Sequence, residues 1–235
     1  MQISEYHFDA GLKQELVLLY ASDLHHCDNA PLISAIRAAG AQALLVGGDF
    51  IHGAKVYSRG LDFLHQCATM LPTFCVLGNH EMRYEGNVRE AVVQTGATLL
   101  DHTFVALGGV LIGGLTTGYA PGEMQRRRGL PPPPNEEFLA RFSSEPGYKL
   151  LLSHHPEYWE RYIRPLPIAL TISGHAHGGQ WRFFGRGVYA PGQGLFPRYT
   201  AGLYEGRLLV GRGLGNPYPV PRLFNPPELL RLHLH

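Results

Sequence analysis

The sequence is poor in cysteine and in long apolar runs, and each shortage excludes a class of protein. Its 235 residues include three cysteines with no CxxC spacing, so neither a disulfide framework nor a cysteine-ligated zinc site is expected. No stretch approaches the roughly 20 apolar residues of a membrane span, and the amino terminus lacks the basic region of a signal peptide. We therefore expect a cytoplasmic protein without membrane insertion.

An excess of charge of either sign is also missing. The 20 Lys and Arg residues nearly balance the 19 Asp and Glu residues, and 45% of the chain is apolar. This composition is typical of a globular protein and gives no support to specific nucleic-acid binding. Lysine is scarce, with only Lys13, Lys55 and Lys149, whereas histidine is abundant, with 13 residues. The position of these histidines is the main question that the composition raises.

Short runs of Leu, Val and Ile alternate with segments of helical period, which is typical of βαβ units in an α/β fold. The pattern predicts a single domain over residues 1–235, with an Arg/Pro-rich loop insertion at 119–135 and an extended C-terminal segment at 216–235 on the domain surface. Helices are expected at 31–39, 61–70 and 88–95. Strands are expected at 16–20, 44–46, 74–77, 104–106, 110–112, 150–153, 169–173, 188–190, 203–204 and 208–210.

Polar clusters follow five of these predicted strands. They are Asp23-Leu24-His25, Gly48-Asp49, Gly78-Asn79-His80-Glu81, Ser153-His154-His155 and Gly174-His175-Ala176-His177. In open α/β sheets, ligands bind in the crevice outside the carboxyl ends of the strands. Side chains two residues apart on an extended segment point the same way, so each of the pairs D-x-H and H-x-H can supply two ligands to one cavity.

These residue types suit a borderline divalent ion such as Mn²⁺, Zn²⁺ or Fe²⁺, which binds imidazoles, carboxylates and amide oxygens. The candidate ligands are Asp23, His25, Asp49, Asn79, His154, His175 and His177. Seven ligands are too many for one small ion with an open position, whereas two ions solve the count. Asp49, in the middle of the set, could bridge them at the ~3.5–4 Å separation of two-metal hydrolytic sites.

The ordered motifs D-x-H, G-D, G-N-H-E, H and G-H-x-H resemble the signature of the calcineurin-like metallophosphoesterase superfamily. The run 174–180, together with 199–204 and 211–215, resembles the bacterial YkuE/YaeI-type phosphodiesterase branch. The resemblance implies a four-layer α/β/β/α sandwich of two mixed β-sheets. It also implies a small phosphodiester or other phosphate-containing molecule as substrate.

The resemblance further implies a role for each site residue. One metal would be held by Asp23, His25, Asp49 and His177, and the other by Asp49, Asn79, His154 and His175. A metal-bridged hydroxide would attack phosphorus in line, while His80 would stabilise the phosphate charge or protonate the leaving oxygen. Two divalent ions are the implied cofactors, with Mn²⁺ favoured and Zn²⁺, Fe²⁺/Fe³⁺ or Mg²⁺ as alternatives.

One position departs from the family pattern. Many members have an Asp three residues after the bridging Asp, where it orients the catalytic histidine, but this chain has His52. A histidine cannot supply the same fixed negative charge. Either Glu81 or another carboxylate takes over that role, or His80 is less well tuned as an acid.

Other functions stay open at this point. One is a pyrophosphatase for a UDP-linked lipid such as UDP-2,3-diacylglucosamine, and another is a non-catalytic metal-binding interaction module. The guanidinium groups of Arg126, Arg127 and Arg128 are candidates for gripping a phosphate, although such a run is more often a solvated loop. The sequence gives no support for peripheral membrane association and does not indicate an oligomeric state.

Overall fold

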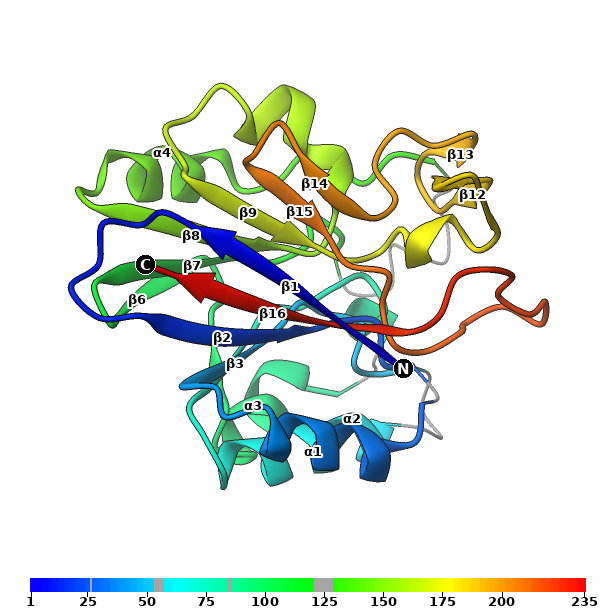
Figure 1. The fold of residues 1–235 in the computed structure, drawn as a ribbon, viewed down its shortest axis with the longest axis horizontal. Helices are drawn as coiled ribbons and strands as arrows, with labels where there is room; N and C mark the ends of the chain where they lie inside the picture. The colour runs from blue at the N-terminus through cyan, green and yellow to red at the C-terminus, as the bar shows by residue number, and fades with distance from the viewer. Residues whose placement is uncertain (26, 53–56, 84–85, 121–128) are drawn as a thin grey trace.

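Two mixed β-sheets lie face to face, and helices cover their outer faces (Figure 1). The structure, a computed structural model, describes residues 1–25, 27–52, 57–83, 86–120 and 129–235. In this part of the chain each of the two large sheets has six strands. The layers form the α/β/β/α sandwich of two mixed sheets that the resemblance implies, so this prediction is confirmed.

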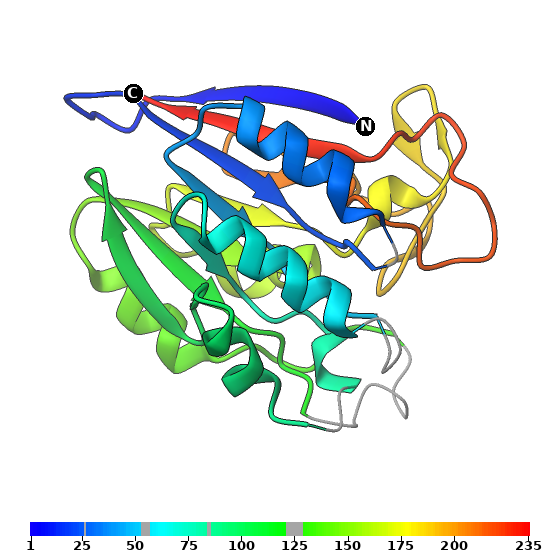
Figure 2. The same cartoon turned by 90° about the horizontal axis from the view of Figure 1, so that it is seen from below.

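The first sheet carries the N-terminal half of the chain and its last strand. Its strands, in spatial order, are β1 (Gln2–Phe8), β16 (Glu228–Leu234), β2 (Leu16–Ala21), β3 (Ala43–Val46), β4 (Thr73–Cys75) and β5 (Thr98–Leu99). Strands β2 to β5 are parallel, and β16 runs antiparallel to β2. The outer face is covered by α1 (Asn29–Ala38), α2 (Tyr57–Ala68) and α3 (Val88–Gln94), as Figure 2 shows.

The second sheet is built from the middle of the chain. Its strands are β14 (Gly202–Tyr204), β15 (Leu208–Val210), β9 (Leu170–Ser173), β8 (Tyr148–Ser153), β7 (Val110–Leu115) and β6 (Thr103–Leu107). Its outer face packs on α4 (Glu136–Ser144) and the helical turns η4 (Pro156–Tyr158) and η5 (Trp159–Ile163). Smaller elements are β10 (Arg182–Phe183), β11 (Arg186–Gly187), β12 (Tyr189–Ala190), β13 (Gly194–Leu195), η2 (Glu81–Arg83) and η6 (His177–Gly179). Among the described residues, no helix is both long and apolar enough to cross a bilayer.

Strand β2 shows why the inner strands are apolar throughout. Leu18 and Tyr20 point between the two sheets, while Leu19 and Ala21 point toward the helices. A strand with both faces covered has no solvent side, so it reads as a continuous apolar run rather than an alternating one. This pattern made β2, β3, β8 and β9 predictable from the sequence.

The C-terminal segment corrects one prediction. Residues 216–235 were expected to lie extended on the surface, but residues 228–234 form β16, between β1 and β2. Leu230, Leu232 and Leu234 are fully buried between the sheets. The first and last strands of the chain therefore lie side by side, as the blue and red strands of Figure 1 show. The prolines before Glu228 suggested a tail, and the polar positions of β1 concealed an edge strand.

The predicted loop insertion at 119–135 is described only in part. Arg126, Arg127 and Arg128 lie outside the described residues. Of the proline run, Pro132 and Pro134 are buried rather than on the surface. The Tyr158 hydroxyl donates a hydrogen bond to the Pro132 carbonyl at 2.9 Å, which fastens this end of the loop to the second sheet.

The position of β16 predicts a large stability loss for Leu232→Ala. The side chain is fully buried between the sheets, so its truncation removes apolar contacts and leaves a cavity. We expect the free energy of unfolding to fall by about 2–5 kcal/mol in urea titrations. Arg231→Ala, in the same strand but facing the other side with a partly exposed ion pair to Glu5, should cost about 1 kcal/mol or less. Equal losses for both variants would contradict the assigned register.

Candidate active site

The sheet order explains why residues far apart in sequence meet at one place. Strands β2, β3 and β4 are neighbours in the first sheet, and β8 and β9 are neighbours in the second. All five end at the same edge of the sandwich, and each is followed by one of the predicted polar clusters. The structure therefore brings together all eight predicted residues, each at most 8% exposed: Asp23, His25, Asp49, Asn79, His80, His154, His175 and His177.

Five of these eight residues have a left-handed backbone. The φ angles of Asp23, His25, Asp49, His175 and His177 lie between 45° and 63°. Residues other than glycine pay about 1–2 kcal/mol for this conformation. Such strain persists where the surrounding structure fixes it, and it concentrates at functional sites. The backbone thus marks the same positions as the motifs.

Two glycines allow the loops to approach this closely. A Cβ atom on Gly78 would lie 2.4 Å from Asp49 Oδ1, and one on Gly174 would lie 2.5 Å from Asp23 Oδ2. Any side chain at either position would displace a carboxylate. These glycines are therefore required by the site rather than by a turn alone.

A first group of donor atoms comes from Asp23, His25 and His177, whose ligand atoms all lie within 4.8 Å of one another. His177 Nε2 lies 3.4 Å from His25 Nε2 and 3.6 Å from Asp23 Oδ1. The Asp23 carboxylate also accepts hydrogen bonds from Ser22 Oγ at 2.7 Å and from the His175 N–H at 3.1 Å. These bonds fix the carboxylate toward the two imidazoles.

A second group surrounds Asp49. Its Oδ2 lies 3.2 Å from His154 Nε2 and 3.9 Å from both His25 Nε2 and His80 Nε2. His154 Nδ1 lies 2.8 Å from the Gly47 carbonyl, and this hydrogen bond fixes the ring with Nε2 toward Asp49. Asp49 thus lies between His25 of the first group and His154 of the second, where a bridging ligand would have to be.

Burial controls the charge of these side chains. It lowers the pKa of His25 and His177 well below the usual range and that of His175 to about 3, so these three imidazoles are neutral. Burial also disfavours the charged forms of His154 and Asp49, but the attraction between these two side chains outweighs that effect. The pKa of His154 rises to about 10, and that of Asp49 falls well below its usual range. His25, His175 and His177 are therefore already in the neutral form that binds cations, whereas His154 has to lose its Nε2 proton before that nitrogen can bind one.

Two buried imidazole nitrogens of this site lack a full set of hydrogen-bond partners among the described residues. His175 Nδ1 is buried and has no hydrogen-bond partner among the described residues, and His154 Nε2 has only the Asp49 contact. Buried polar atoms are normally paired, so these nitrogens call for a further partner. A set of imidazole nitrogens, carboxylates and an amide oxygen fits divalent cations such as Mn²⁺ and Zn²⁺.

The ring of His80 lies with Nε2 beside the Asp49 carboxylate, and among the described residues no second carboxylate binds its other nitrogen, Nδ1. Its Nδ1 has no hydrogen-bond partner among the described residues, and its ring stacks on that of His52 at 4.7 Å. Both Glu81 oxygens are used elsewhere, accepting the N–H groups of Asp49, Ile51 and Gly78 at 2.7–2.9 Å. The hypothesis that Glu81 replaces the missing Asp at His80 is therefore wrong. Burial lowers the pKa of His80 to about 4, which makes its ring neutral at pH 7.

Several residues at this site carried no signal in the sequence. A pocket of about 270 Å³ opens over the cluster, and Arg83, Pro191, Pro217 and Tyr218 form its rim. Arg222 Nη2 lies 3.3 Å from His177 Nδ1. Most of these residues come from segments rich in glycine and proline, whose path cannot be predicted from local patterns.

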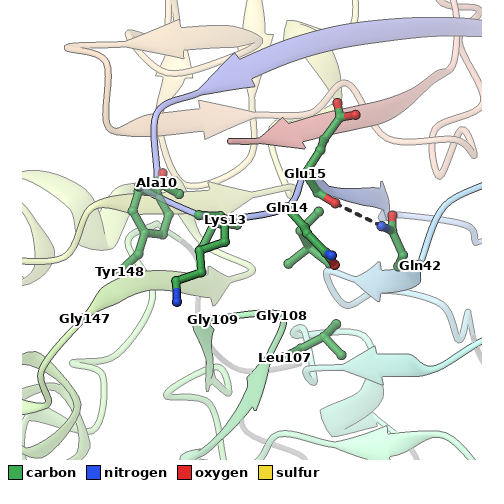
Figure 3. A pocket seen from close by; sticks show the side chains of 13 residues that line it. Ala10, Lys13, Gln14, Glu15, Gln42, Leu107, Gly108, Gly109, Gly147 and Tyr148 are labelled. Atoms are coloured by element: carbon green, nitrogen blue, oxygen red, sulfur yellow. Dashed lines mark hydrogen bonds between the residues drawn. The ribbon is translucent and has the colours of Figure 1, made fainter.

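A larger cavity, of about 860 Å³, lies at the opposite edge of the sheets, between the loops that precede β2, β3 and β8 (Figure 3). Its wall includes Lys13 and Tyr148, and Gln42 donates a hydrogen bond to the Glu15 carbonyl there. Of the described residues that line it, none is a histidine or an aspartate. The residues that line this cavity thus lack the imidazole and aspartate donors typical of the candidate site.

A separate group of ionisable side chains, on β1 and β16, includes Glu5, His7 and His233. His7 Nδ1 faces His235 Nε2 at 3.2 Å, and the planes of the two rings are parallel within 1°. One hydrogen bond between the rings accounts for this contact. This geometry agrees with leaving these histidines outside the predicted site.

Comparison with known proteins gives consistent matches. Residues 16–179 match the family described as calcineurin-like phosphoesterase. The chain is 31% identical to phosphodiesterase YaeI of Escherichia coli K12, over 92% of this chain and 81% of that protein. It is 27% identical to an uncharacterized metallophosphoesterase of Helicobacter pylori, over 95% of this chain and 60% of that one. A solved structure of phosphopantetheinyl hydrolase from Mycobacterium tuberculosis aligns with a TM-score of 0.49 and 16% identity, covering 83% and 88% of the two chains.

Proposed function

Because the chain belongs to the calcineurin-like phosphoesterase family and is thus a phosphoester hydrolase, we propose that it is a dinuclear metal-dependent phosphodiesterase. The observation that carries this proposal is the convergence of eight buried polar side chains from five strand ends on one site, and five of these side chains line one pocket. The similarity to phosphodiesterase YaeI favours diesters over monoesters. The pocket volume of about 270 Å³ supports a small phosphodiester group as the reacting part of the substrate.

In this proposal the two groups of donors hold one divalent ion each, with Mn²⁺ favoured. Asp23, His25 and His177 hold the first ion, Asn79, His154 and His175 hold the second, and Asp49 is shared. Two such ions, when bound, lower the pKa of a water molecule and neutralise the charge on phosphate oxygens.

His80 acts on the substrate rather than on the ions. Its ring lines the pocket, and Asp49 accepts its backbone N–H at 2.8 Å, which fixes the residue beside the carboxylate. A neutral imidazole donates a hydrogen bond from one ring nitrogen, so His80 is placed to stabilise a phosphate or leaving-group oxygen. His52, stacked on it, holds the plane of the ring.

The function is tested by hydrolysis of bis(p-nitrophenyl) phosphate by the purified, Mn²⁺-loaded protein. We expect turnover that is lost with EDTA, restored by Mn²⁺, and faster than turnover of the monoester p-nitrophenyl phosphate. A metal-loaded, folded protein that hydrolyses neither ester would overturn the proposal. Faster hydrolysis of the monoester would overturn its phosphodiesterase part.

Metal binding is also expected to raise the thermal stability. The buried His175 Nδ1, which has no partner among the described residues, gains one when a cation binds, and the buried Asp49 carboxylate gains a further positive charge beside it. A ligand at 100 times its dissociation constant stabilises by about 2.7 kcal/mol. For a chain of this size, we expect the melting temperature to rise by about 5–10 °C when Mn²⁺ is added to EDTA-treated protein. A melting temperature that does not respond to Mn²⁺ or Zn²⁺ would contradict the metal site.

A further inference from the structure

Three phenylalanines have exposed rings, one in the turn between β10 and β11 and two at bends. Phe184, Phe196 and Phe224 are 104%, 82% and 78% exposed, and their φ angles are 51°, 52° and 52°. A left-handed backbone is unfavourable for a bulky residue, and an exposed aromatic ring adds a second unfavourable term. Glycine or asparagine would serve a plain turn better. The unfavourable φ angle and the unfavourable exposure of an aromatic ring coincide at three positions, which indicates that these rings bind something other than the rest of the chain.

These rings belong to one surface. We call Phe183, Phe184, Leu195, Phe196 and Phe224 the aromatic surface. The rings of Phe183 and Phe224 lie 5.8 Å apart, and both border a hollow of about 490 Å³ that Phe184 shares. A second hollow of about 670 Å³ includes Phe196, and Gly185 lines both. The segments that carry the surface gather at one end of the molecule (Figures 1 and 2).

The backbone holds the aromatic surface in place. The N–H of Arg182 donates to the Leu223 carbonyl at 3.0 Å, which ties the hairpin of β10 and β11 to the segment that carries Phe224. The N–H of Val188 donates to the Gly179 carbonyl at 3.0 Å, next to His177 of the candidate site. The aromatic surface is thus built on the turn that carries a site residue, and the rings cannot withdraw into a core without breaking these bonds.

The charge around the aromatic surface has one sign. The residues that line the two hollows include Arg182, Arg186, Arg198 and Arg212 and no acidic side chain. Arg198 and Arg212 form ion pairs with glutamates outside the hollows. Arg182 donates to the Gly178 and Gly185 carbonyls and to Thr200 Oγ1, so its guanidinium is committed within the fold. Arg186 is exposed and forms no ion pair within the described part of the chain. The surface therefore combines protruding rings with positive charge.

We propose that the aromatic surface docks on an anionic lipid bilayer. Single exposed rings in separate turns and bends suit insertion between lipid headgroups, and aromatic side chains favour the boundary between water and acyl chains. The exposed Arg186 beside them attracts the phosphates of an anionic leaflet. Pro191, in the turn between β12 and β13, and Pro217 and Tyr218, in the segment before Phe224, also form the rim of the pocket, so docking brings the pocket mouth to the bilayer. The proposal concerns binding and does not depend on the proposed catalysis.

The test is sedimentation of the full chain with vesicles of phosphatidylcholine alone or mixed with phosphatidylglycerol. We expect binding to the mixed vesicles that F184S/F196S weakens at least about tenfold, because two rings no longer leave water. R186Q should weaken it by roughly fivefold on mixed vesicles and hardly at all on phosphatidylcholine. Val93→Ser, which removes an apolar side chain of 62% exposure on α3, is the matched control and should bind like the wild type.

The outcomes separate docking from its alternatives. The rate of bis(p-nitrophenyl) phosphate hydrolysis in solution, without vesicles, should be the same in all these variants as in the wild type. A wild-type protein that binds mixed vesicles but hydrolyses no ester would refute the catalytic proposal and support docking. Wild-type binding no stronger than that of F184S/F196S would overturn docking. A dimer in light scattering that F184S/F196S abolishes, without vesicle binding, would overturn it in favour of contact between two copies.

Discussion

Asp49→Asn is expected to lower metal-dependent phosphodiester hydrolysis by at least about 10³-fold while the protein remains folded. The Asp49 Oδ2 atom lies 3.2 Å from His154 Nε2 and 3.9 Å from His25 Nε2, so one carboxylate serves both groups of donors. An amide has the same shape but no charge, and it places an N–H or a weaker acceptor where the cations need an anion. Loss of about 4 kcal/mol of charge stabilisation corresponds to about 10³ in rate.

The fold of the Asp49→Asn variant should survive because the oxygen of the new side-chain amide can still accept the His80 N–H, which Asp49 Oδ1 accepts at 2.8 Å. Steady-state kinetics at saturating Mn²⁺ measure the loss of activity, and titration calorimetry measures the loss of metal affinity. Asp62→Asn removes a carboxylate on the exposed side of α2 and should leave both unchanged. Activity of the folded Asp49→Asn variant within tenfold of the wild type would show that Asp49 does not bridge the site.

The position of this site was predictable because two independent patterns coincide in the sequence. Buried strands of a parallel sheet read as apolar runs, and each of five runs ends in a polar cluster, so the strand ends fix where Asp23, Asp49 and His154 lie along the fold. The contacts between β2, β3 and β4 then follow from the short βα connections. The left-handed φ angles of the same residues could not be read from the sequence, since histidine and aspartate are not glycine.

What the sequence did not reveal depends on long-range pairing. Strand β16 pairs with β1 across the whole length of the chain, and no local pattern specifies which strand a C-terminal segment will join. The same holds for Tyr218 and Arg222, which reach the pocket only because β16 anchors the segment behind them. Residues of this kind are placed by the closure of the first sheet rather than by their neighbours in sequence.

Glu81 shows how a motif can be recognised and its role misjudged. The run Gly78-Asn79-His80-Glu81 was identified as a site motif, and His52 in place of the usual Asp suggested Glu81 as a substitute partner for His80. In the structure its carboxylate instead joins the loops after β3 and β4. A buried carboxylate that accepts several backbone N–H groups acts as a fixed cross-link, which sets the separation of Asp49 and Asn79.

Glu81→Ala is therefore expected to destabilise the protein strongly. The substitution leaves the N–H groups of Asp49, Ile51 and Gly78 buried without an acceptor, at roughly 1–3 kcal/mol each. The resulting loss of about 3–9 kcal/mol is a large part of the roughly 5–15 kcal/mol by which a typical domain is stable. Urea denaturation measures it, and Asp62→Ala, at an exposed carboxylate, should change the free energy of unfolding by less than about 0.5 kcal/mol.

Glu81→Gln distinguishes this structural role from a role in tuning His80. Glutamine keeps one carbonyl oxygen for two of the N–H groups but turns an amide donor toward the third, so we expect an intermediate loss of stability. If Glu81 instead acted on the His80 ring, Glu81→Gln would shift the pH dependence of kcat while leaving the urea midpoint unchanged. A shift of the urea midpoint with an unaltered pH profile is the result that the hydrogen bonds predict, because both Glu81 oxygens face the backbone and neither faces the imidazole.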